Sequence, residues 1–169
     1  GEDRQAFCAV RPPGHHAEYD NAMGFCLFNN IAVAARYAIK HYELSRVAII
    51  DFDVHHGNGT ENIIAGDKQI LMCSSFQHPF YPHSGHPVSA SNILSAPLKA
   101  GATGAEFRES VAYWFDALRN FMPQLILISA GFDAHAEDAM GQLRLREDDY
   151  HCVNKENRTG GGGGRTGGK

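Results

Sequence analysis

Apolar runs alternate along the chain with segments whose apolar residues recur every three or four positions, which predicts strands alternating with helices. Short runs rich in Val, Ile and Leu are typical of strands buried on both faces of a parallel sheet. A strand, helix, strand order favours parallel pairing, so we predict an α/β fold with a mainly parallel sheet and flanking helices. The predicted strands span residues 6–10, 47–50, 69–75, 93–98 and 125–130, and the predicted helices span residues 28–42, 60–65, 105–121 and 147 onward.

The two longest predicted helices each carry an apolar face. The helix at 28–42 has small apolar residues at helical spacing, which suits close packing on a sheet, and either Asn29 or Asn30 can cap its start. The helix at 105–121 carries a bulky apolar face, which we assign to the core rather than to a cofactor site: Phe107, Val111, Trp114, Phe115 and Leu118.

Polar side chains directly follow the strand predicted at 47–50. Residues 47–60 read VAIIDFDVHHGNGT, so Asp51, Asp53 and His55 come before the glycines that end the strand. Side chains alternate along an extended chain, and these three can therefore point to the same side. Two carboxylates and an imidazole at the carboxyl edge of a parallel sheet predict a divalent-metal site. The simpler alternative is a strand end that carries solvated charge.

Two further strand ends supply candidate partners for this site. An RPPG turn at 11–14 ends the first predicted strand and delivers His15 and His16 into the next loop, although a tandem pair alone can arise by chance. Asp133 follows the strand predicted at 125–130. Most of the 10 histidines lie in loops after predicted strands, which favours one shared site over scattered surface positions: His15, His16, His55, His56, His78, His83, His86 and His135.

A long connection at 76–92 reads FQHPFYPHSGHPVSASN and has no regular pattern. Connections of this length inside a compact domain are more often functional than idle. Its bulky residues Phe76, Phe80 and Tyr81 either plug a surface groove or line a substrate channel, and the sequence favours neither.

The residues at these strand ends suffice for amide hydrolysis. Two Asp and one His leave one coordination position of zinc open to water, whereas a structural zinc site is closed by four protein ligands. Zinc lowers the pKa of such a water and polarises a carbonyl, and a nearby His pair can take the proton and protonate the leaving amine. Each imidazole needs an acceptor for its far nitrogen, and Asp51 and Asn58 are placed to serve.

Composition narrows the function classes. Of the 169 residues, 43% are hydrophobic and 20% are charged, which suits a globular domain. The formal net charge of -4 gives no support for direct nucleic-acid binding, and no apolar stretch predicts a membrane span or a signal segment. We expect the scattered cysteines to be reduced thiols of a cytoplasmic protein, or of a nuclear one in a eukaryote: Cys8, Cys26, Cys73 and Cys152.

The segments RPPGHHA, GFCLFNN, DFDVHHGNGT and SAGFDAH resemble, in sequence and order, the motifs of the zinc-dependent histone deacetylase superfamily. The resemblance covers residues 6–153 and points to the class II branch and to bacterial histone-deacetylase-like and acetylpolyamine amidohydrolases. It implies the arginase/deacetylase α/β fold and hydrolysis of the acetyl amide in an acetylated lysine peptide or an acetylpolyamine.

Matched motif by motif, the resemblance implies a role for each residue of the site. The zinc ligands would be Asp53, His55 and Asp133, and the general acid/base pair would be His15, held by Asp51, and His16, held by Asn58. The two aromatic walls of the acyl-lysine tunnel would be Phe25 and Tyr81, and the carbonyl that accepts the substrate amide hydrogen would belong to Gly24. A monovalent-cation site, occupied by K⁺, is also implied beside Asp51, Asp53, His55 and Ser74.

Two departures from the family pattern predict an internal fragment, truncated at both ends. The family carries further strands before the first motif, and its oxyanion-stabilising tyrosine lies in a glycine-rich motif after the last one. Here residues 160–164 are all glycine, but no tyrosine follows Tyr150. Removing one oxyanion donor typically costs about a hundred- to a thousandfold in rate. We therefore predict a partial deacetylase catalytic domain at residues 1–153 and a glycine-rich tail at 154–169, flexible or non-native.

Other functions remain open. The missing tyrosine favours a metal-binding fragment that is catalytically inactive. An arginase-like binuclear hydrolase on the same fold would need more carboxylates at the Asp-bearing strand ends. The choice between acetyl-lysine and acetylpolyamine also stays open, because both substrates are extended aliphatic amides.

Overall fold

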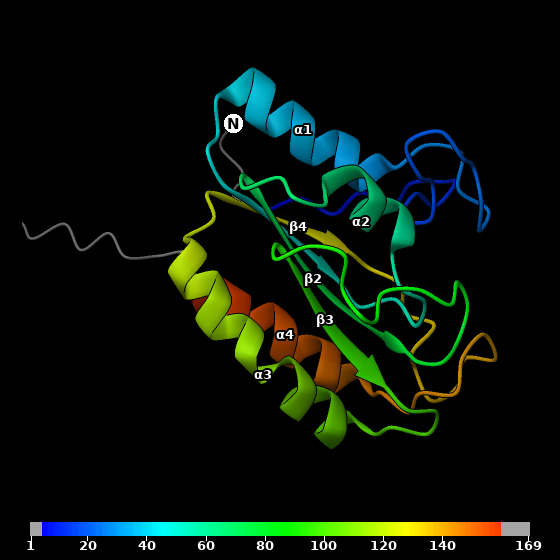
Figure 1. Ribbon diagram of the computed structural model, residues 1–169. Helices are drawn as coiled ribbons and strands as arrows, with labels where there is room; N and C mark the ends of the chain where they lie inside the picture. The colour runs from blue at the N-terminus through cyan, green and yellow to red at the C-terminus, as the bar shows by residue number, and fades with distance from the viewer. Residues whose placement is uncertain (1–4, 160–169) are drawn as a thin grey trace, which may run out of the picture.

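A computed structural model describes residues 5–159 and shows a parallel sheet between two layers of helices (Figure 1). The strands are β1 Val47–Asp51, β2 Ile70–Gln77, β3 Ile93–Leu98 and β4 Leu125–Ser129, in the spatial order β3-β2-β1-β4. Helices α1 Asn30–Tyr42 and α2 Asn58–Ile64 lie on one side of the sheet, and α3 Gly104–Phe121 and α4 Glu147–Thr159 lie on the other. Every pairing among these strands is parallel, which confirms the predicted fold class.

Strand β1 lies inside the sheet and separates two hydrophobic cores. Ala48 and Ile50 belong to the core formed with α3 and α4, whereas Val47 and Ile49 belong to the core formed with α1. Because side chains alternate along a strand, Asp51 is the next residue on the face of Val47 and Ile49. The strand therefore directs its polar end towards the side of the sheet that carries α1 and α2.

The helices follow the apolar spacing in the sequence. Helix α1 begins after Asn29, whose side chain accepts a hydrogen bond from the Ala32 amide at 3.0 Å, so Asn29 rather than Asn30 is the cap. Helix α3 buries Phe107 and Trp114 completely against the sheet. No helix in the described part of the chain is long and apolar enough to cross a membrane.

Among the boundaries that differ from the sequence prediction, three change how the chain is divided. Residues 6–10 are an exposed coil and not a strand, because no strand of the described residues pairs with their backbone groups. Strand β2 continues through Phe76 to Gln77, so the irregular loop begins at residue 78. Helix α4 continues to Thr159, beyond the predicted domain boundary at 153, and the remainder of the predicted tail lies outside the described residues.

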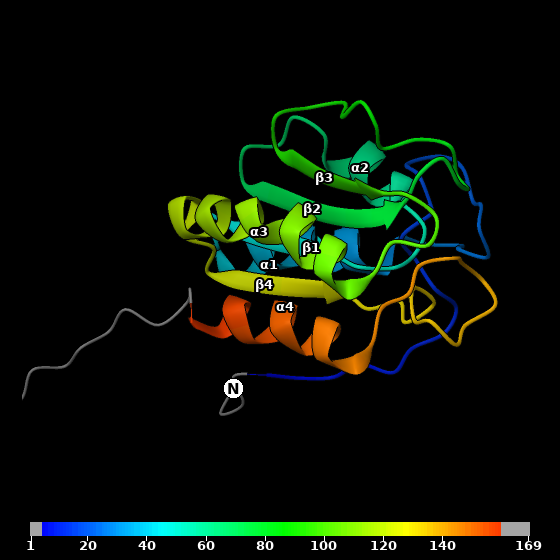
Figure 2. The same cartoon turned by 90° about the horizontal axis from the view of Figure 1, so that it is seen from below.

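The loops that follow the strands gather at the carboxyl end of the sheet, and the segment that precedes α1 lies at the same end (Figure 2). Strand β4 forms one edge of the described sheet and is less covered than β1, with the Ile128 side chain 40% exposed. Polar residues from distant parts of the sequence are brought together at this end.

Candidate active site

The side chains of Asp53, His55 and Asp133 meet at the carboxyl end of the sheet. Asp53 and His55 follow β1, and Asp133 follows β4, which pairs with β1. One ligand atom from each residue lies within 4.8 Å of the other two. His55 Nδ1 is 2.9 Å from Asp53 Oδ1 and 3.2 Å from Asp133 Oδ2. The predicted convergence of these strand ends is therefore present.

These three atoms fit a single divalent ion. Ligand atoms about 2.0–2.2 Å from a tetrahedral zinc ion lie about 3.3 Å from one another, close to the separations of His55 Nδ1 from the two carboxylates. One imidazole nitrogen with two carboxylate oxygens is also a donor set that suits zinc. Three protein ligands leave a coordination position for water or substrate.

Backbone amides fix the orientation of both carboxylates. The Val54 amide donates to Asp133 Oδ1 at 2.9 Å, and the His55 amide donates to Asp53 Oδ1 at 2.8 Å. In each carboxylate the second oxygen accepts no backbone hydrogen bond, so it is available to another partner. The turn after β1 thus fixes the orientation of this candidate metal-binding group.

His15 and His16 lie beside this group, each with Nδ1 bonded to a different kind of acceptor. His15 Nδ1 is 2.9 Å from Asp51 Oδ2, and His16 Nδ1 is 2.7 Å from Asn58 Oδ1. The Asn58 amide nitrogen donates to Glu18 Oε1 at 2.8 Å, which turns its oxygen towards His16. Because both acceptor oxygens can only accept, Nδ1 carries the proton in each ring and Nε2 points the other way.

The two acceptors lead to opposite charge states. Burial disfavours the charged form of His15, but Asp51, with help from Asp53 and Asp133, outweighs it and raises the pKa of His15 to about 9. Burial and the neighbouring His15 lower the pKa of His16 to about 4, and its hydrogen bond to the uncharged Asn58 does not offset them. At neutral pH, His15 is therefore protonated and His16 is neutral, with a lone pair on Nε2.

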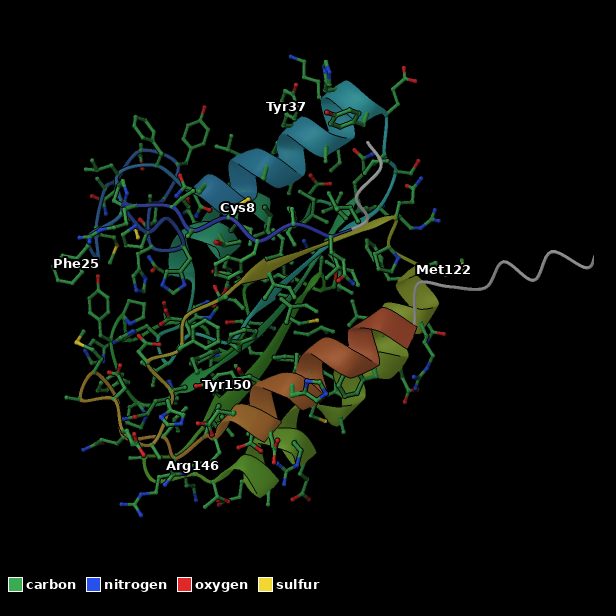
Figure 3. The ribbon with its side chains drawn as sticks, turned by 180° about the vertical axis from the view of Figure 1, so that it is seen from behind. Cys8, Phe25, Tyr37, Met122, Arg146 and Tyr150 are labelled. Carbon is green, nitrogen blue, oxygen red and sulfur yellow. The ribbon has the colours of Figure 1, made fainter. Side chains whose placement is uncertain are left out.

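A pocket of about 520 Å³ opens over these side chains. The Tyr81 ring meets His16 edge-on, with ring centroids 5.1 Å apart. Phe25 is 86% exposed and stands at the outer rim of the molecule (Figure 3). Gly24 has a φ of 55° and a Cβ there would lie 2.3 Å from His16 Cδ2, so only glycine fits this turn. The lining residues are Pro13, His15, His16, Gly24, Phe25, Asp53, His55, Tyr81, Asp133 and Met140.

The aromatic residues of the 76–92 segment divide between the two roles considered from the sequence. Phe76 is buried in β2 against the ring of His56, so it is a core residue. Phe80 stacks on His55 with ring centroids 5.3 Å apart, and Tyr81 lines the pocket. Only the middle of the segment contributes to the site.

Comparison with known proteins identifies the family. The sequence model described as Histone deacetylase domain matches residues 1–159, most of the 169-residue chain. The chain belongs to the histone deacetylase family. The pocket over the Asp53, His55 and Asp133 group is therefore the candidate active site of a deacetylase domain.

Individual relatives agree with this assignment. The chain is 45% identical over 157 residues to histone deacetylase 10, chloroplastic, of Oryza sativa subsp. japonica, covering 87% of this chain and 35% of the relative. Its structure matches the HDA15 HD domain with a TM-score of 0.84 at 34% identity, covering 91% of this chain and 47% of the other. It also matches acetylpolyamine aminohydrolase from Burkholderia pseudomallei, with a TM-score of 0.75 at 33% identity, covering 85% of this chain and 44% of the other. The chain thus spans less than half the length of these three proteins.

Histidine abundance proved a weaker guide to the candidate active site than histidine position. Three of the histidines singled out from the sequence line the pocket, whereas His56, His78, His83, His86 and His135 do not. His56 is fully buried, with its Nδ1 2.9 Å from the Ser74 hydroxyl. The idea that all eight share one site is therefore wrong. The predicted K⁺ site beside Ser74 stays a prediction.

Two lining residues of this pocket carried no chemical signal in the sequence. Pro13 belongs to the turn before the His pair, so its proximity could have been foreseen. Met140 lies in the long loop after Asp133 and is 54% exposed. No spacing pattern predicts its position, because that loop folds back over the pocket through tertiary contacts.

We expect Gly131→Ala to weaken metal binding by about 10- to 100-fold, the range seen when a ligand loses its support. A Cβ at Gly131 would lie 2.0 Å from Asp53 Oδ2, so the carboxylate must move out of the ligand group. Zinc affinity, measured by competition with a chromogenic chelator, tests this. Gly66→Ala is the control. Its φ of 81° also makes the substitution strained, but no atom lies within 4 Å of the added Cβ, so no ligand is displaced. Equal zinc affinity in both variants would contradict the assignment of Asp53.

Proposed function

We propose that this chain carries the catalytic centre of a zinc-dependent deacetylase that hydrolyses the acetyl amide of an acetylated amine. The observation that carries the proposal is the convergence of a three-ligand metal group with a histidine pair in one pocket. Each histidine of the pair has its own acceptor, so the two rings are fixed and chemically different.

Asp53, His55 and Asp133 would hold the zinc ion. Bound there, zinc supplies Lewis-acid activation of a water molecule and of the substrate carbonyl. Each ligand comes from a strand end or from the turn after it, so the sheet sets their separation. The mixed nitrogen and oxygen donor set favours zinc over magnesium or calcium, which prefer oxygen ligands alone.

His16 and His15 would divide the proton transfer between them. With its Nδ1 proton engaged by Asn58, His16 presents the Nε2 lone pair to the pocket and can take a proton from the attacking water. The proton can then pass to the nitrogen of the leaving amine. His15, with Nδ1–H donated to Asp51, keeps its positive charge close to the position where negative charge develops on the carbonyl oxygen.

The substrate would enter as an extended aliphatic amide between Phe25 and Tyr81. Both rings line the pocket, and apolar aromatic walls suit a methylene chain. The Gly24 carbonyl would accept the hydrogen of the scissile amide. Acetylated lysine peptides and acetylpolyamines share this chemistry, and the matching family and structures carry the names histone deacetylase and acetylpolyamine aminohydrolase.

A zinc-binding chain without hydrolytic activity is the second candidate, and one observation favours it. Within the described residues, Tyr81 is the tyrosine that lines the pocket, and its ring packs edge-on against His16. No second tyrosine hydroxyl from these residues reaches the pocket as a donor to the oxyanion. Binding and turnover must therefore be measured separately.

The test uses the 169-residue chain as it stands. Prepared without metal and titrated with zinc, it should bind one ion per chain, bind a small hydroxamate only when zinc is present, and hydrolyse a fluorogenic acetyl-lysine amide. If the chain binds one zinc ion and the hydroxamate but does not hydrolyse the substrate, it is the second candidate, a zinc-binding chain without hydrolytic activity. Two metals per chain would favour a binuclear hydrolase, and no zinc uptake would overturn the proposal.

A further inference from the structure

A buried polar network lies behind the candidate active site. His56 is 1% exposed and does not line the pocket, although its neighbour His55 does. Its Nε2 is 2.6 Å from Glu61 Oε2, and its Nδ1 is 2.9 Å from the Ser74 hydroxyl. Since a carboxylate only accepts, the Nε2–H donates to Glu61. Both nitrogens of this buried ring thus have a hydrogen-bond partner: one partner lies on α2 and the other on β2.

The same carboxylate also holds the loop that follows β2. The second oxygen of Glu61, Oε1, accepts a hydrogen bond from the Ser89 amide at 3.0 Å. Glu61 therefore joins the core imidazole to the second half of the loop with one side chain. Its partners fix both carboxylate oxygens, a geometry that a flexible surface glutamate does not have.

A second contact brings the loop against the imidazole itself. Gly85 has a φ of 89°, and a Cβ there would lie 2.6 Å from His56 Cδ2, so the loop backbone packs directly on the ring. The Gly85 carbonyl accepts from the Ser95 hydroxyl at 2.8 Å. Apart from these contacts, residues 84–91 are mostly exposed, so few interactions hold this part of the loop.

The first half of the same loop forms a wall of the pocket. Phe80 stacks on His55, and Tyr81 packs edge-on against His16. The His83 amide donates to the Phe80 carbonyl at 2.7 Å, which closes a tight turn after the two aromatic residues. Movement of residues 84–91 would therefore be transmitted to Tyr81 through only a few residues of chain.

We propose that Glu61 is a positioning residue, which acts through His56 and the Ser89 amide to fix the loop at residues 78–92. It would thereby set the width of the pocket beside Tyr81, which is the channel that a long substrate would pass. Glu61 touches neither the metal group nor the pocket, so it acts on the fit of long substrates and not on the chemical step. The role of the channel rests on the proposed function, whereas the fixing of the loop does not.

The test compares two hydroxamates on the zinc-loaded chain. Acetohydroxamate reaches only the zinc, and an aryl-capped long-chain hydroxamate must also pass Tyr81. We expect Glu61→Ala to weaken the long ligand by about tenfold or more, the effect of losing a buried hydrogen bond to a charged group, with zinc and acetohydroxamate affinities unchanged. Equal weakening of both ligands would overturn the positioning role.

Two further variants separate positioning from folding. Glu61→Gln keeps an oxygen for the Ser89 amide, and its NH2 can donate to His56 Nε2 when the ring carries its proton on Nδ1 and donates to the Ser74 hydroxyl, so it should restore most of the long-ligand affinity. Ser89→Pro removes the amide donor at an exposed residue and leaves Glu61 and His56 in place, so it should reproduce the selective loss even if Glu61→Ala fails to fold. Glu147→Ala is the matched control. Glu147 Oε2 also lies near a histidine, 3.8 Å from His135 Nε2, but its side chain is 86% exposed.

Hydrogen exchange gives a readout that does not depend on zinc or on turnover. In both variants the hydrogen-bonded amides of His83 and Ile93, on either side of this part of the loop, should exchange at least about tenfold faster, while those of β1 keep their protection. In Glu61→Ala the Ser89 amide, which has lost its acceptor, should also exchange faster. If the unmodified chain binds no zinc, the proposed function fails and this measurement still decides whether Glu61 fixes the loop. Unchanged exchange in both variants would contradict the inference.

Discussion

Asp133→Asn should lower the zinc affinity of the chain by more than about a hundredfold, beyond the range expected for residues that merely support a ligand. The substitution keeps the side-chain volume and leaves an oxygen that can still accept from the Val54 amide, as Asp133 Oδ1 does at 2.9 Å. It removes the negative charge and replaces a carboxylate ligand beside His55 Nδ1 with an uncharged amide, which binds zinc more weakly. Isothermal titration measures the change, at a pH where zinc can displace the proton of His55 into the buffer.

Thermal denaturation distinguishes lost metal binding from lost structure. Saturating zinc should raise the melting temperature of the unmodified chain, since a ligand that binds only the folded state stabilises it. It should leave the melting temperature of Asp133→Asn almost unchanged. Glu137→Ala is the control on the same loop, because Glu137 makes only an exposed ion pair with Arg146. Zinc affinity retained in Asp133→Asn would remove Asp133 from the ligand set.

The alternation of side chains in β1 accounts for how well the metal group could be predicted. Val47 and Ile49 are buried on one face, and the residues two and four positions beyond Asp51 continue that face into the pocket. Asp133 could be placed from sequence as well, because parallel strands end at the same edge and β4 pairs with β1 in register. Local periodicity and one topological rule are enough for these positions.

Residues whose environment depends on tertiary partners could not be predicted in the same way. Residues 6–10 have a strand-like composition, but a strand also needs a neighbour to pair with, and composition says nothing about that neighbour. Phe76, Phe80 and Tyr81 share one segment and have three different environments, each set by a contact with a distant histidine. Periodicity cannot assign contacts of this kind.

The pairing of His56 with Glu61 shows the same limit on a smaller scale. The sequence placed the start of the short helix at residue 60, whereas α2 begins at Asn58. Glu61 lies in the first turn with either start, and its amide donates to the Gly57 carbonyl at 3.0 Å while its carboxylate reaches back to His56. The buried hydrogen bond to His56 depends on the fold of the turn between β1 and α2, which periodicity does not predict.

His16→Ala should reduce hydrolysis of a fluorogenic acetyl-lysine amide by about 100- to 10,000-fold, the usual contribution of a general acid or base. The reason is the state of the ring: its Nδ1 proton is held by Asn58 at 2.7 Å, so Nε2 is the atom that can take a proton in the pocket. Turnover is measured on the zinc-loaded chain, after subtracting the rate with zinc alone.

Zinc stoichiometry must stay at one ion per chain in this variant, because His16 supplies no atom to the group formed by Asp53, His55 and Asp133. A loss of zinc would show that the substitution acts by distorting the ligands, and the assignment of His16 as a proton carrier would then fail. His41→Ala is the matched control, since His41 lies on α1, stacked on Tyr37 and away from the pocket. If both variants hydrolyse the substrate at the rate of the unmodified chain, the proton must travel through another group, and His15 is the remaining imidazole beside the ligands.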